Sequence, residues 1–559
     1  MKAEDIYKQW LNDPGIDEDT RNELLSIEGN ASEIEDRFYQ DLEFGTAGLR
    51  GVIGAGTNRM NIYTVSRATK GLADYISSQK GGAERGVAIA YDSRHMSPEF
   101  ADISASVLNA QGIKAYVFES LRPTPDLSFA VRELKCIAGI NVTASHNPAE
   151  YNGYKVYWED GAQVTPPHDT GIMKCVEAVP SLTSAIFMDR ADAEEKGLFV
   201  TLGKEDDNAY ITTILGEIKE PEAIAAVADE MKIVYTPLHG TGITIVPEAL
   251  KRAGFKNIEV VPEQEKPDGS FPTVKYPNPE MPEAFALPDA LGKASGADLI
   301  IATDPDADRI GVHLKDAKGE YHALSGNMIG AVMCEYELSR RAANGNLPED
   351  GFVVRSIVSG RMVDAIAANY GVKLIEVLTG FKYIGGEILK AEESGKGTYL
   401  FGYEESYGFL TGDYARDKDA CGAALVLAEL AAFCRKQGIT PWESVQALYE
   451  KYGFFKEKTI SVTLPGVDGL KQIKEIMDGF RINPPASFGS FNVVGSLDYE
   501  KPETTGLPKA NVVYFELEKG WVTVRPSGTE PKIKYYIGVQ AEDEACADKA
   551  IAEIESAFK

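Results

Sequence analysis

The feature that most constrains the fold is a strand–helix–strand–helix–strand order that occurs three times and ends each time in a polar loop. The three loops are Thr143–Pro148, Thr303–Arg309 and Gly402–Gly408. The spacing differs from pass to pass, which excludes a solenoid with a tight period and indicates three related α/β units. This order predicts mostly parallel sheets covered by helices, with ligands bound beyond the carboxyl ends of the strands. We therefore expect each unit to bring one loop to a shared cleft.

Short apolar runs predict the strands, and helix signals fill the intervals between them. Ser97 before Pro98 predicts a helix start with Ser97 as the N-cap, and Gly254 predicts a helix end. Near the N-terminus, Ser32–Glu35 has the form of a capping box, so we expect the first 45 residues to be helical. The predicted strands are Val87–Tyr91, Lys114–Phe118, Ile137–Val142, Lys232–Tyr235, Ile258–Val261, Asp298–Ala302, Phe352–Ser356, Lys373–Val377 and Thr398–Phe401.

The chain changes character from about Phe454 onward. Alternating polar and apolar residues, followed by a final helix over Glu542–Phe558, predict an α+β domain. The fold class is therefore α/β, with three related mixed or parallel-sheet domains and a C-terminal α+β domain around a central cleft. The predicted domains are residues 1–205, 206–322, 323–450 and 451–559.

Charge and composition exclude several classes of function. The 57 basic and 85 acidic residues leave a net charge of −28 over 559 residues, which disfavours nucleic acid or an anionic membrane as a partner. No apolar run approaches the ~20 residues that span a bilayer, and the N-terminus does not resemble a signal peptide. The six cysteines are scattered, which predicts reduced, buried thiols in a cytoplasmic protein. A monomer or a homodimer is expected.

The loop Thr303–Arg309 offers a candidate metal site, because Asp304, Asp306 and Asp308 alternate along it. Three carboxylates suit Mg²⁺ or Ca²⁺ rather than zinc. An EF-hand would need glycine at its sixth position and glutamate at its twelfth, where this chain has Arg309 and Lys315. A solvated acidic turn is the alternative, but it leaves the repulsion between the carboxylates uncompensated. Mg²⁺ is the preferred ion, because it leaves room for water and a phosphate oxygen.

The loop Thr143–Pro148 places Ser145 beside His146 at a strand end. There is no Gly-x-Ser-x-Gly turn, so the pair does not indicate a hydrolase. A hydroxyl beside a metal site can instead carry a phosphoryl group, although a plain polar turn explains this loop equally well on its own.

Two further loops carry polar groups suited to a phosphosugar. Arg525–Lys532 combines hydroxyls, glycine and cations in the manner of a phosphate cradle, with a surface turn as the alternative. Gly402–Gly408 presents two carboxylates and a serine between glycines, which can accept hydrogen bonds from sugar hydroxyls; a helix cap is the alternative.

Taken together and in this order, TASHNP, DPDADR, GYEESYG and RPSGTEPK resemble the loops of the α-D-phosphohexomutase superfamily. The resemblance covers essentially the whole chain. The N-terminal helices, FGTAGLRG and Tyr403 in GYEESYG are most similar to the branch that holds phosphoglucomutase, phosphopentomutase and glucose-1,6-bisphosphate synthase.

The resemblance implies a role for each matching residue. Ser145 would be phosphorylated, and Asp304, Asp306 and Asp308 would hold Mg²⁺ together with a phosphate oxygen on Ser145. His239 is a further candidate, or a structural cap. Groups around the reacting phosphate and sugar would be Arg50, His146, Lys155, Arg309 and Lys382. Sugar hydroxyls would be bound by Glu404 and Ser406, and the non-reacting phosphate by Arg525, Ser527, Gly528, Thr529 and Lys534.

The implied reaction interconverts glucose 1-phosphate and glucose 6-phosphate through phosphoserine and glucose 1,6-bisphosphate, which also serves as activator. His146 and Lys155 are both open as the general base. Ribose, deoxyribose or mannose phosphates are alternative substrates, and net bisphosphate synthesis is an alternative reaction. A non-catalytic sugar-phosphate sensor is the alternative from another class of protein.

Overall fold

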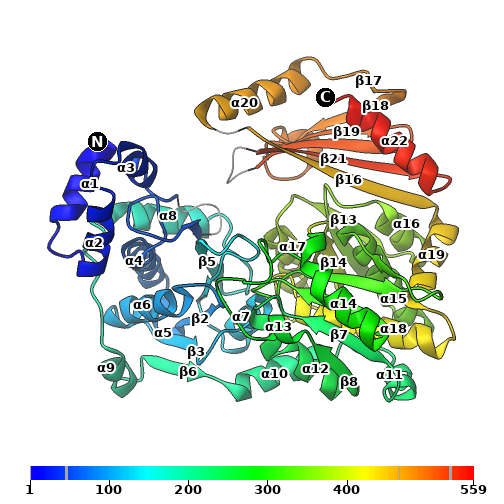
Figure 1. The fold of residues 1–559 in the computed structure, drawn as a ribbon, viewed down its shortest axis with the longest axis horizontal. Helices are drawn as coiled ribbons and strands as arrows, with labels where there is room; N and C mark the ends of the chain where they lie inside the picture. Colours follow the sequence, from blue (N-terminus) through cyan, green and yellow to red (C-terminus); the bar gives the residue numbers. More distant parts are fainter. Residues whose placement is uncertain (1, 44–47, 465, 528–531, 559) are drawn as a thin grey trace. The chain divides into compact units, whose positions relative to one another are not determined.

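The structure is a computed structural model that describes residues 2–43, 48–464, 466–527 and 532–558 (Figure 1). The chain divides into two compact units. Neither unit begins or ends at residue 205 or 450, so the four predicted domain ranges stay a prediction. Unit 1 comprises Met1–His313, Ile388–Lys390 and Gly408–Lys436, and unit 2 comprises Leu314–Glu387, Ala391–Tyr407 and Gln437–Lys559.

The first sheet of unit 1 has six strands in the order β1-β5-β4-β2-β3-β6. The strands β4, β2, β3 and β6 are parallel, whereas β1 and β5 are antiparallel additions at one edge. The sheet is therefore mixed, as predicted. Its strands are β1 (Gly48–Val52), β2 (Val87–Tyr91), β3 (Ala115–Phe118), β4 (Ala138–Val142), β5 (Tyr151–Trp158) and β6 (Phe199–Leu202).

Helices cover both faces of this sheet because its central strand is apolar on both sides. Val87 and Ile89 of β2 belong to the core that includes α4 and α6, whereas Ala88 and Ala90 belong to the core that includes α7. The helices are α4 (Ile62–Ser78), α5 (Gly82–Arg85), α6 (Ser97–Ala110), α7 (Thr124–Glu133), α8 (His168–Ala178) and α9 (Arg190–Glu195).

Three N-terminal helices, drawn in blue in Figure 1, share a separate small core with Trp10 and Phe38. The predicted capping box at Ser32 is wrong, because Ser32 lies inside α3. Asn30 is the N-cap, and its side chain accepts a hydrogen bond from the Glu33 backbone N–H. The helices are α1 (Ala3–Asn12), α2 (Glu18–Ser26) and α3 (Ala31–Phe38).

The second sheet of unit 1 contains the parallel strands β8, β7 and β9, followed by β10. Residues 408–436 return to this unit, and α18 packs against α11 and α12. Gly254 ends α12 with φ +118°, as predicted. The elements are β7 (Lys232–Thr236), β8 (Asn257–Val260), β9 (Leu299–Thr303), β10 (Ile310–Lys315), β15 (Gly408–Thr411), α10 (Lys204–Leu215), α11 (Pro221–Val227), α12 (Val246–Ala253), α13 (Pro262–Glu265), α14 (Ala286–Ser295) and α18 (Ala420–Lys436), with short 3-10 helices at Thr241–Thr244 and Pro282–Phe285.

In unit 2, the strands β13, β12 and β14 lie side by side and parallel, and α15 packs against β14. The predicted strand Lys373–Val377 is confirmed to the residue. The elements are β11 (Tyr321–Ala323), β12 (Gly351–Ser356), β13 (Lys373–Val377), β14 (Thr398–Glu404), α15 (Gly326–Ala343), α16 (Met362–Tyr370), α17 (Phe381–Ser394) and α19 (Pro441–Tyr452).

The C-terminal part of unit 2 is an antiparallel sheet in the order β16-β21-β20-β19-β18-β17. The helices α20 and α22 share the core on one face, and Tyr514 and Trp521 on the other face pack against Ile357 and Leu378. The predicted α+β architecture is confirmed. The elements are β16 (Phe454–Thr463), β17 (Ser487–Phe488), β18 (Phe491–Asp498), β19 (Val513–Leu517), β20 (Gly520–Pro526), β21 (Lys532–Ala541), α20 (Gly466–Ile482), α21 (Pro502–Thr505) and α22 (Glu544–Ser556).

The start of α6, the cysteines and the apolar character of the helices can also be compared with the predictions. Ser97 is the first residue of α6 rather than its N-cap, and its hydroxyl donates to Asp92 Oδ1 at 2.9 Å. All six cysteines are free, but the prediction of burial fails for two of them, because Cys175 is half-buried and Cys546 is exposed. Within the described ranges, no helix combines the length and the apolar character that crossing a membrane requires.

Candidate active site

Two polar loops meet in unit 1, although about 160 residues separate them in sequence. The serine loop (residues 143–148) follows β4, and the aspartate loop (residues 303–309) follows β9. The Ser145 hydroxyl is buried and donates to Asp304 Oδ2 at 2.6 Å. The expectation that these strand-end loops come together is met for this pair.

The aspartate loop is a tight turn held by backbone hydrogen bonds. Asp304 Oδ1 accepts from the backbone N–H groups of Asp308 and Arg309 at 3.1 and 3.0 Å. Ala307 takes φ +49°, a left-handed conformation that closes the turn. Asp306 Oδ2 accepts from Thr124 Oγ1 at 2.9 Å. One carboxylate oxygen from each of the three aspartates lies within 4.8 Å of the other two.

The three carboxylates fit a hard divalent cation. All three side chains are buried. Among the residues that the structure describes, Asp306 Oδ1 and Asp308 Oδ1 have no hydrogen-bond partner, although they are shielded from solvent. Burial and the neighbouring carboxylates Asp306 and Asp308 raise the pKa of Asp304 well above its usual range. Orphaned carboxylate oxygens in a buried acidic cluster are the donors that Mg²⁺ or Ca²⁺ takes.

Ammonium groups offset part of the negative charge at this site. Lys155 Nζ, from β5, donates to Asp306 Oδ2 at 2.9 Å and lies 3.7 Å from Asp308 Oδ2. Burial disfavours the charged form of both residues, but the attraction between the ammonium and the carboxylate is larger. The pKa of Lys155 is therefore raised and the pKa of Asp306 is lowered. Lys155 therefore keeps its proton at neutral pH in this arrangement.

Lys418 is a site residue that sequence reasoning missed. Its Nζ lies 3.0 Å from Asp308 Oδ2 and 2.9 Å from Asp417 Oδ1. Asp417 also accepts from the Tyr157 hydroxyl at 2.8 Å. A signal was present in the sequence, because the run Arg416–Asp419 places four consecutive charged residues directly before the apolar helix α18, and all four are buried.

The groups predicted around the reacting phosphate lie beside the serine loop. His146 Nδ1 is 3.1 Å from Ser145 Oγ. Burial, together with the nearby Arg309 and Arg50, holds the pKa of His146 well below its usual range, so its imidazole is neutral near pH 7. Arg50 Nη1, on β1, donates to Asn147 Oδ1 at 3.3 Å. Arg309 Nη1 donates to Glu280 Oε1 at 3.3 Å.

Unit 2 holds the sugar loop (residues 402–408) as far as Tyr407. Glu404 is buried, and its Oε1 accepts from the Gly380 backbone N–H at 2.6 Å. Glu405 Oε2 accepts from Ser356 Oγ at 3.1 Å, and burial followed by the charge of Glu404 raises the pKa of Glu405 to about 7. Ser406 is half-buried beside them. This loop therefore presents oxygen acceptors that are partly desolvated.

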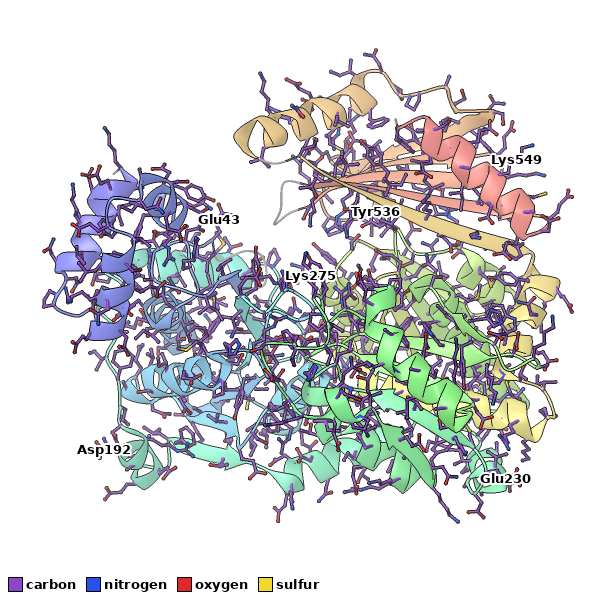
Figure 2. The ribbon with its side chains drawn as sticks, in the orientation of Figure 1. Glu43, Asp192, Glu230, Lys275, Tyr536 and Lys549 are labelled. Carbon is purple, nitrogen blue, oxygen red and sulfur yellow. The ribbon has the colours of Figure 1, made fainter. Side chains whose placement is uncertain are left out.

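The C-terminal sheet of unit 2 carries the phosphate loop (residues 525–532). Arg525 on β20 pairs in the ladder with Lys534 on β21, and the Ser527 N–H donates to the Lys532 carbonyl at 2.7 Å. Tyr536, labelled in Figure 2, lies on β21 and has a raised pKa, first from burial and then from Glu405. Arg525 is close enough to lower the pKa of Glu405 in turn. The predicted residues Gly528 and Thr529 lie outside the described residues.

Three other singled-out residues differ in their surroundings. Lys382 is the second residue of α17, and its Nζ lies 5.5 Å from the centre of the Tyr383 ring. His239 bonds to Thr273 Oγ1 at 2.9 Å and to the Lys266 carbonyl at 3.1 Å, which supports the structural reading of that histidine. Tyr403 is buried, and its hydroxyl donates to the Gly360 carbonyl at 2.9 Å. This tyrosine therefore fixes the sugar loop to the interior of unit 2.

The chain is similar to known proteins over nearly its whole length. A phosphoglucomutase from Staphylococcus epidermidis (strain ATCC 35984) is 37% identical over 535 residues, which is 92% of this chain and 93% of that protein. A phosphoglucomutase from Staphylococcus aureus (strain MRSA252) is 37% identical over 525 residues, with 92% of each chain covered.

Solved structures share the fold. The Paramecium pp63/parafusin phosphoglucomutase in its open form has a TM-score of 0.71 at 18% identity, covering 93% of this chain and 95% of that chain. A phosphoglucomutase/phosphomannomutase family protein from Burkholderia thailandensis has a TM-score of 0.66 at 20% identity, covering 92% and 96%.

Family models match four successive segments in the order that the motifs imply. Phosphoglucomutase/phosphomannomutase alpha/beta/alpha domains I, II and III match residues 41–182, 208–319 and 325–452, and the C-terminal domain matches residues 467–555. With its serine loop against its aspartate loop and these four matches, the chain belongs to the phosphoglucomutase/phosphomannomutase family.

Proposed function

We propose that this protein is a phosphoglucomutase that interconverts α-D-glucose 1-phosphate and glucose 6-phosphate through phospho-Ser145 and glucose 1,6-bisphosphate. The observation that carries the proposal is the 2.6 Å hydrogen bond from Ser145 Oγ to Asp304, within a buried group of three aspartates. A nucleophilic hydroxyl beside a candidate Mg²⁺ site is the arrangement that phosphoryl transfer needs. The 37% identity to curated phosphoglucomutases over 92% of the chain supports glucose as the sugar.

Asp304, Asp306 and Asp308 would hold Mg²⁺, together with a phosphate oxygen on Ser145. The ion supplies positive charge that offsets the charge of the phosphoryl group. Lys155 and Lys418 contribute further positive charge from the protein, because Lys155 contacts Asp306 and Lys418 contacts Asp308. Phosphoserine adds about −1.5 to −2 charge to this loop, so such compensation is required.

The reaction needs two transfers at the same serine. The bond between phosphorus and Ser145 Oγ breaks as phosphorus bonds to the 6-oxygen of glucose 1-phosphate, and the 6-hydroxyl proton passes to a base. The leaving Ser145 Oγ gains a proton, and the resulting glucose 1,6-bisphosphate reorients. In the second transfer the bond between phosphorus and the 1-oxygen breaks as phosphorus bonds to Ser145 Oγ; the serine proton passes to the base, the 1-oxygen takes up a proton, and glucose 6-phosphate is released. The neutral imidazole of His146 can accept a proton, whereas the charged Lys155 is suited to holding phosphate oxygens.

The remaining residues would bind the parts of the substrate that do not react. Glu404 and Ser406 accept or donate hydrogen bonds to sugar hydroxyls. The non-reacting phosphate is assigned to Arg525, Ser527, Gly528, Thr529 and Lys534, and Arg50, Arg309 and Lys382 hold phosphate or sugar oxygens during transfer. Binding both ends of the sugar keeps the bisphosphate from escaping between the two transfers.

The first test is the rate of glucose 6-phosphate formation from glucose 1-phosphate with Mg²⁺ and a trace of glucose 1,6-bisphosphate. Mannose 1-phosphate and ribose 1-phosphate are assayed at equal concentration, and we expect the highest kcat/KM with glucose. Ser145→Ala should lose activity by at least ~10³-fold, because the intermediate cannot form. Full activity of Ser145→Ala would overturn the mechanism, and preference for ribose or net bisphosphate formation would change the substrate or the reaction.

A further inference from the structure

One buried arginine, Arg94, connects the serine loop to the sheet. Arg94 follows β2, and its guanidinium donates to four backbone carbonyls of the segment that starts at the nucleophile. The acceptors are the carbonyls of Ser145, Asn147, Pro148 (2.8 Å) and Tyr151 (3.0 Å). One side chain therefore spans the whole turn from Ser145 to the start of β5.

Side chains near Arg94 also hold the backbone N–H of Ser145. Asp92 Oδ2 lies 3.3 Å from Arg94 Nε and accepts from Thr143 Oγ1 at 2.6 Å. Thr143 Oγ1 in turn accepts from the Ser145 backbone N–H at 2.8 Å. The backbone of Ser145 is thus held at both its N–H and its carbonyl, by a chain of groups that are all buried.

These ties are needed because the turn is strained. Ser145 has φ +51°, a left-handed conformation that is unfavourable for a residue with a side chain. Such a conformation persists only where surrounding contacts enforce it. Here it directs the hydroxyl at Asp304, so loss of the ties would let Oγ move away from the aspartate loop.

A second loop, which includes Gly269 and Phe271, packs against Arg94. The Phe271 ring centre is 5.0 Å from the Arg94 guanidinium carbon, and Phe271 is itself buried. The neighbouring Gly269 packs so closely that an added Cβ would lie 2.6 Å from the His95 backbone nitrogen. Arg94 is 1% exposed, so its guanidinium cannot turn to solvent without leaving these carbonyls.

We infer that Arg94 is a positioning residue for phosphoryl transfer, acting through the backbone of the serine loop rather than by touching the substrate. The inference rests on the proposed function, in which Ser145 carries the phosphoryl group. A planar guanidinium with five N–H donors can serve several carbonyls at once, whereas a lysine ammonium is a compact point charge. Arg94→Lys keeps the charge and removes most of these ties.

The experiment compares Arg94→Lys with Arg59→Lys. Arg59 is another buried arginine of unit 1 that donates to backbone carbonyls, at Asp36 and Asn58, away from the serine loop. We expect Arg94→Lys to lower kcat by about 100-fold, the effect of a misplacement near 1 Å, while KM for glucose 1-phosphate changes less than about threefold. Hydrogen exchange of the amides of residues 143–151 should accelerate in this variant, and both quantities should stay at the wild-type level in Arg59→Lys.

The two readouts separate failure of this inference from failure of the proposed function. Wild-type kcat together with unchanged exchange in Arg94→Lys would overturn the positioning role. Peptide mass spectrometry of the wild type that finds no phosphoserine at Ser145 would overturn the proposed mechanism, while exchange still reports whether Arg94 holds the loop. If Arg94→Lys does not fold, Phe271→Leu decides: the guanidinium loses its brace, kcat should fall about tenfold, and an unchanged kcat counts against the inference.

Discussion

Lys418 changes how charge is balanced at the aspartate loop. Three buried carboxylates would repel one another by up to about 4 kcal/mol for each pair at 4 Å and an effective dielectric near 20. Lys155 contacts Asp306, and Lys418 contacts Asp308 and Asp417, so the protein itself supplies positive charge to the cluster. Lys418 is distant from the aspartates in sequence, and nothing local in its neighbourhood says which cluster it joins.

We predict that Lys418→Met destabilises the protein by about 3 kcal/mol when metal is chelated. The substitution leaves the buried carboxylates of Asp308 and Asp417 without this partner, and breaking a buried pair from one side typically costs that much. Urea denaturation in EDTA measures the loss. Lys436→Met is the control, because the side chain of that lysine is 36% exposed and its Nζ lies 4.0 Å from the exposed Glu222. Equal stability of the two variants would contradict the prediction.

At the level of elements, local patterns predicted where a strand lies better than which other strand it pairs with. Val87–Tyr91 was predicted to the residue, because an apolar run lies between Gly86 and Asp92. The antiparallel pairing of β1 with β5 was not anticipated, because Gly48–Val52 has no alternating pattern and reads as a glycine-rich loop. Similarly, Arg94 carries no local sign that it binds the serine loop, since that contact depends on long-range packing.

The turn at Gly240 leads to a prediction about the aspartate loop. An added Cβ at Gly240 would lie 2.3 Å from Pro305 Cα, so one of the two backbones must move. We expect Gly240→Ala to weaken Mg²⁺ binding at least about tenfold, because displaced ligands lose their common geometry. Isothermal titration with Mg²⁺ measures this.

Gly479→Ala is the matched control for that substitution. It lies in α20, where, apart from its two chain neighbours and the backbone of its own helix, no heavy atom of the described residues lies within 4 Å of the added Cβ, and it should stabilise the helix by about 0.5–1 kcal/mol. Mg²⁺ affinity that is unchanged in Gly240→Ala would show that the aspartate loop tolerates the shift.

The strand β16 carries a carboxyl group that should make unit 2 sensitive to pH. Glu457 is near Asn327 and Gly360, and burial raises its pKa from 4.5 to about 7. The folded state therefore binds this proton more tightly than the unfolded state. The stability contributed by the proton is present below pH 4.5 and is lost as pH rises through about 7.

We predict that Glu457→Gln removes up to about 3 kcal/mol of the loss in stability between pH 5 and pH 8. Urea midpoints measured at several pH values give the slope. Glu516→Gln, an exposed glutamate on β19, should leave the slope of the wild type in place. A parallel slope in all three proteins would mean that Glu457 does not titrate in this range.

On the scale of the whole molecule, the candidate residues divide between two units. Ser145 and the three aspartates belong to unit 1, whereas the sugar loop up to Tyr407 and the phosphate loop belong to unit 2. The motifs predicted which residues matter, but the division follows from contacts between distant segments. The α/β fold class and the C-terminal α+β architecture were predicted correctly, because the patterns that indicate strands and helices are local, whereas the strands added at the sheet edges, such as β1 and β5, were not predicted.

Mg²⁺ should act on one unit. At about 100 times its dissociation constant, a ligand stabilises the state that binds it by about 2.7 kcal/mol. We predict that Mg²⁺ slows hydrogen exchange in residues 143–148, 303–309 and 417–419, with little change in β19 and β20 at short exchange times. Ca²⁺ at the same concentration tests ion selectivity. Equal protection of the C-terminal strands would contradict the assignment of the metal to the three aspartates.

The return of residues 408–436 to unit 1 has a consequence for synthesis on the ribosome. Unit 1 cannot be completed when residue 313 emerges, because α18 and Lys418 are made later. Translation of the intervening stretch takes roughly 5–20 s at the usual rate of about 5–20 residues per second. During that interval the nascent chain holds three aspartates without one of their lysines, so a dissolved cation or a chaperone has its greatest opportunity to act on this protein before its synthesis is finished.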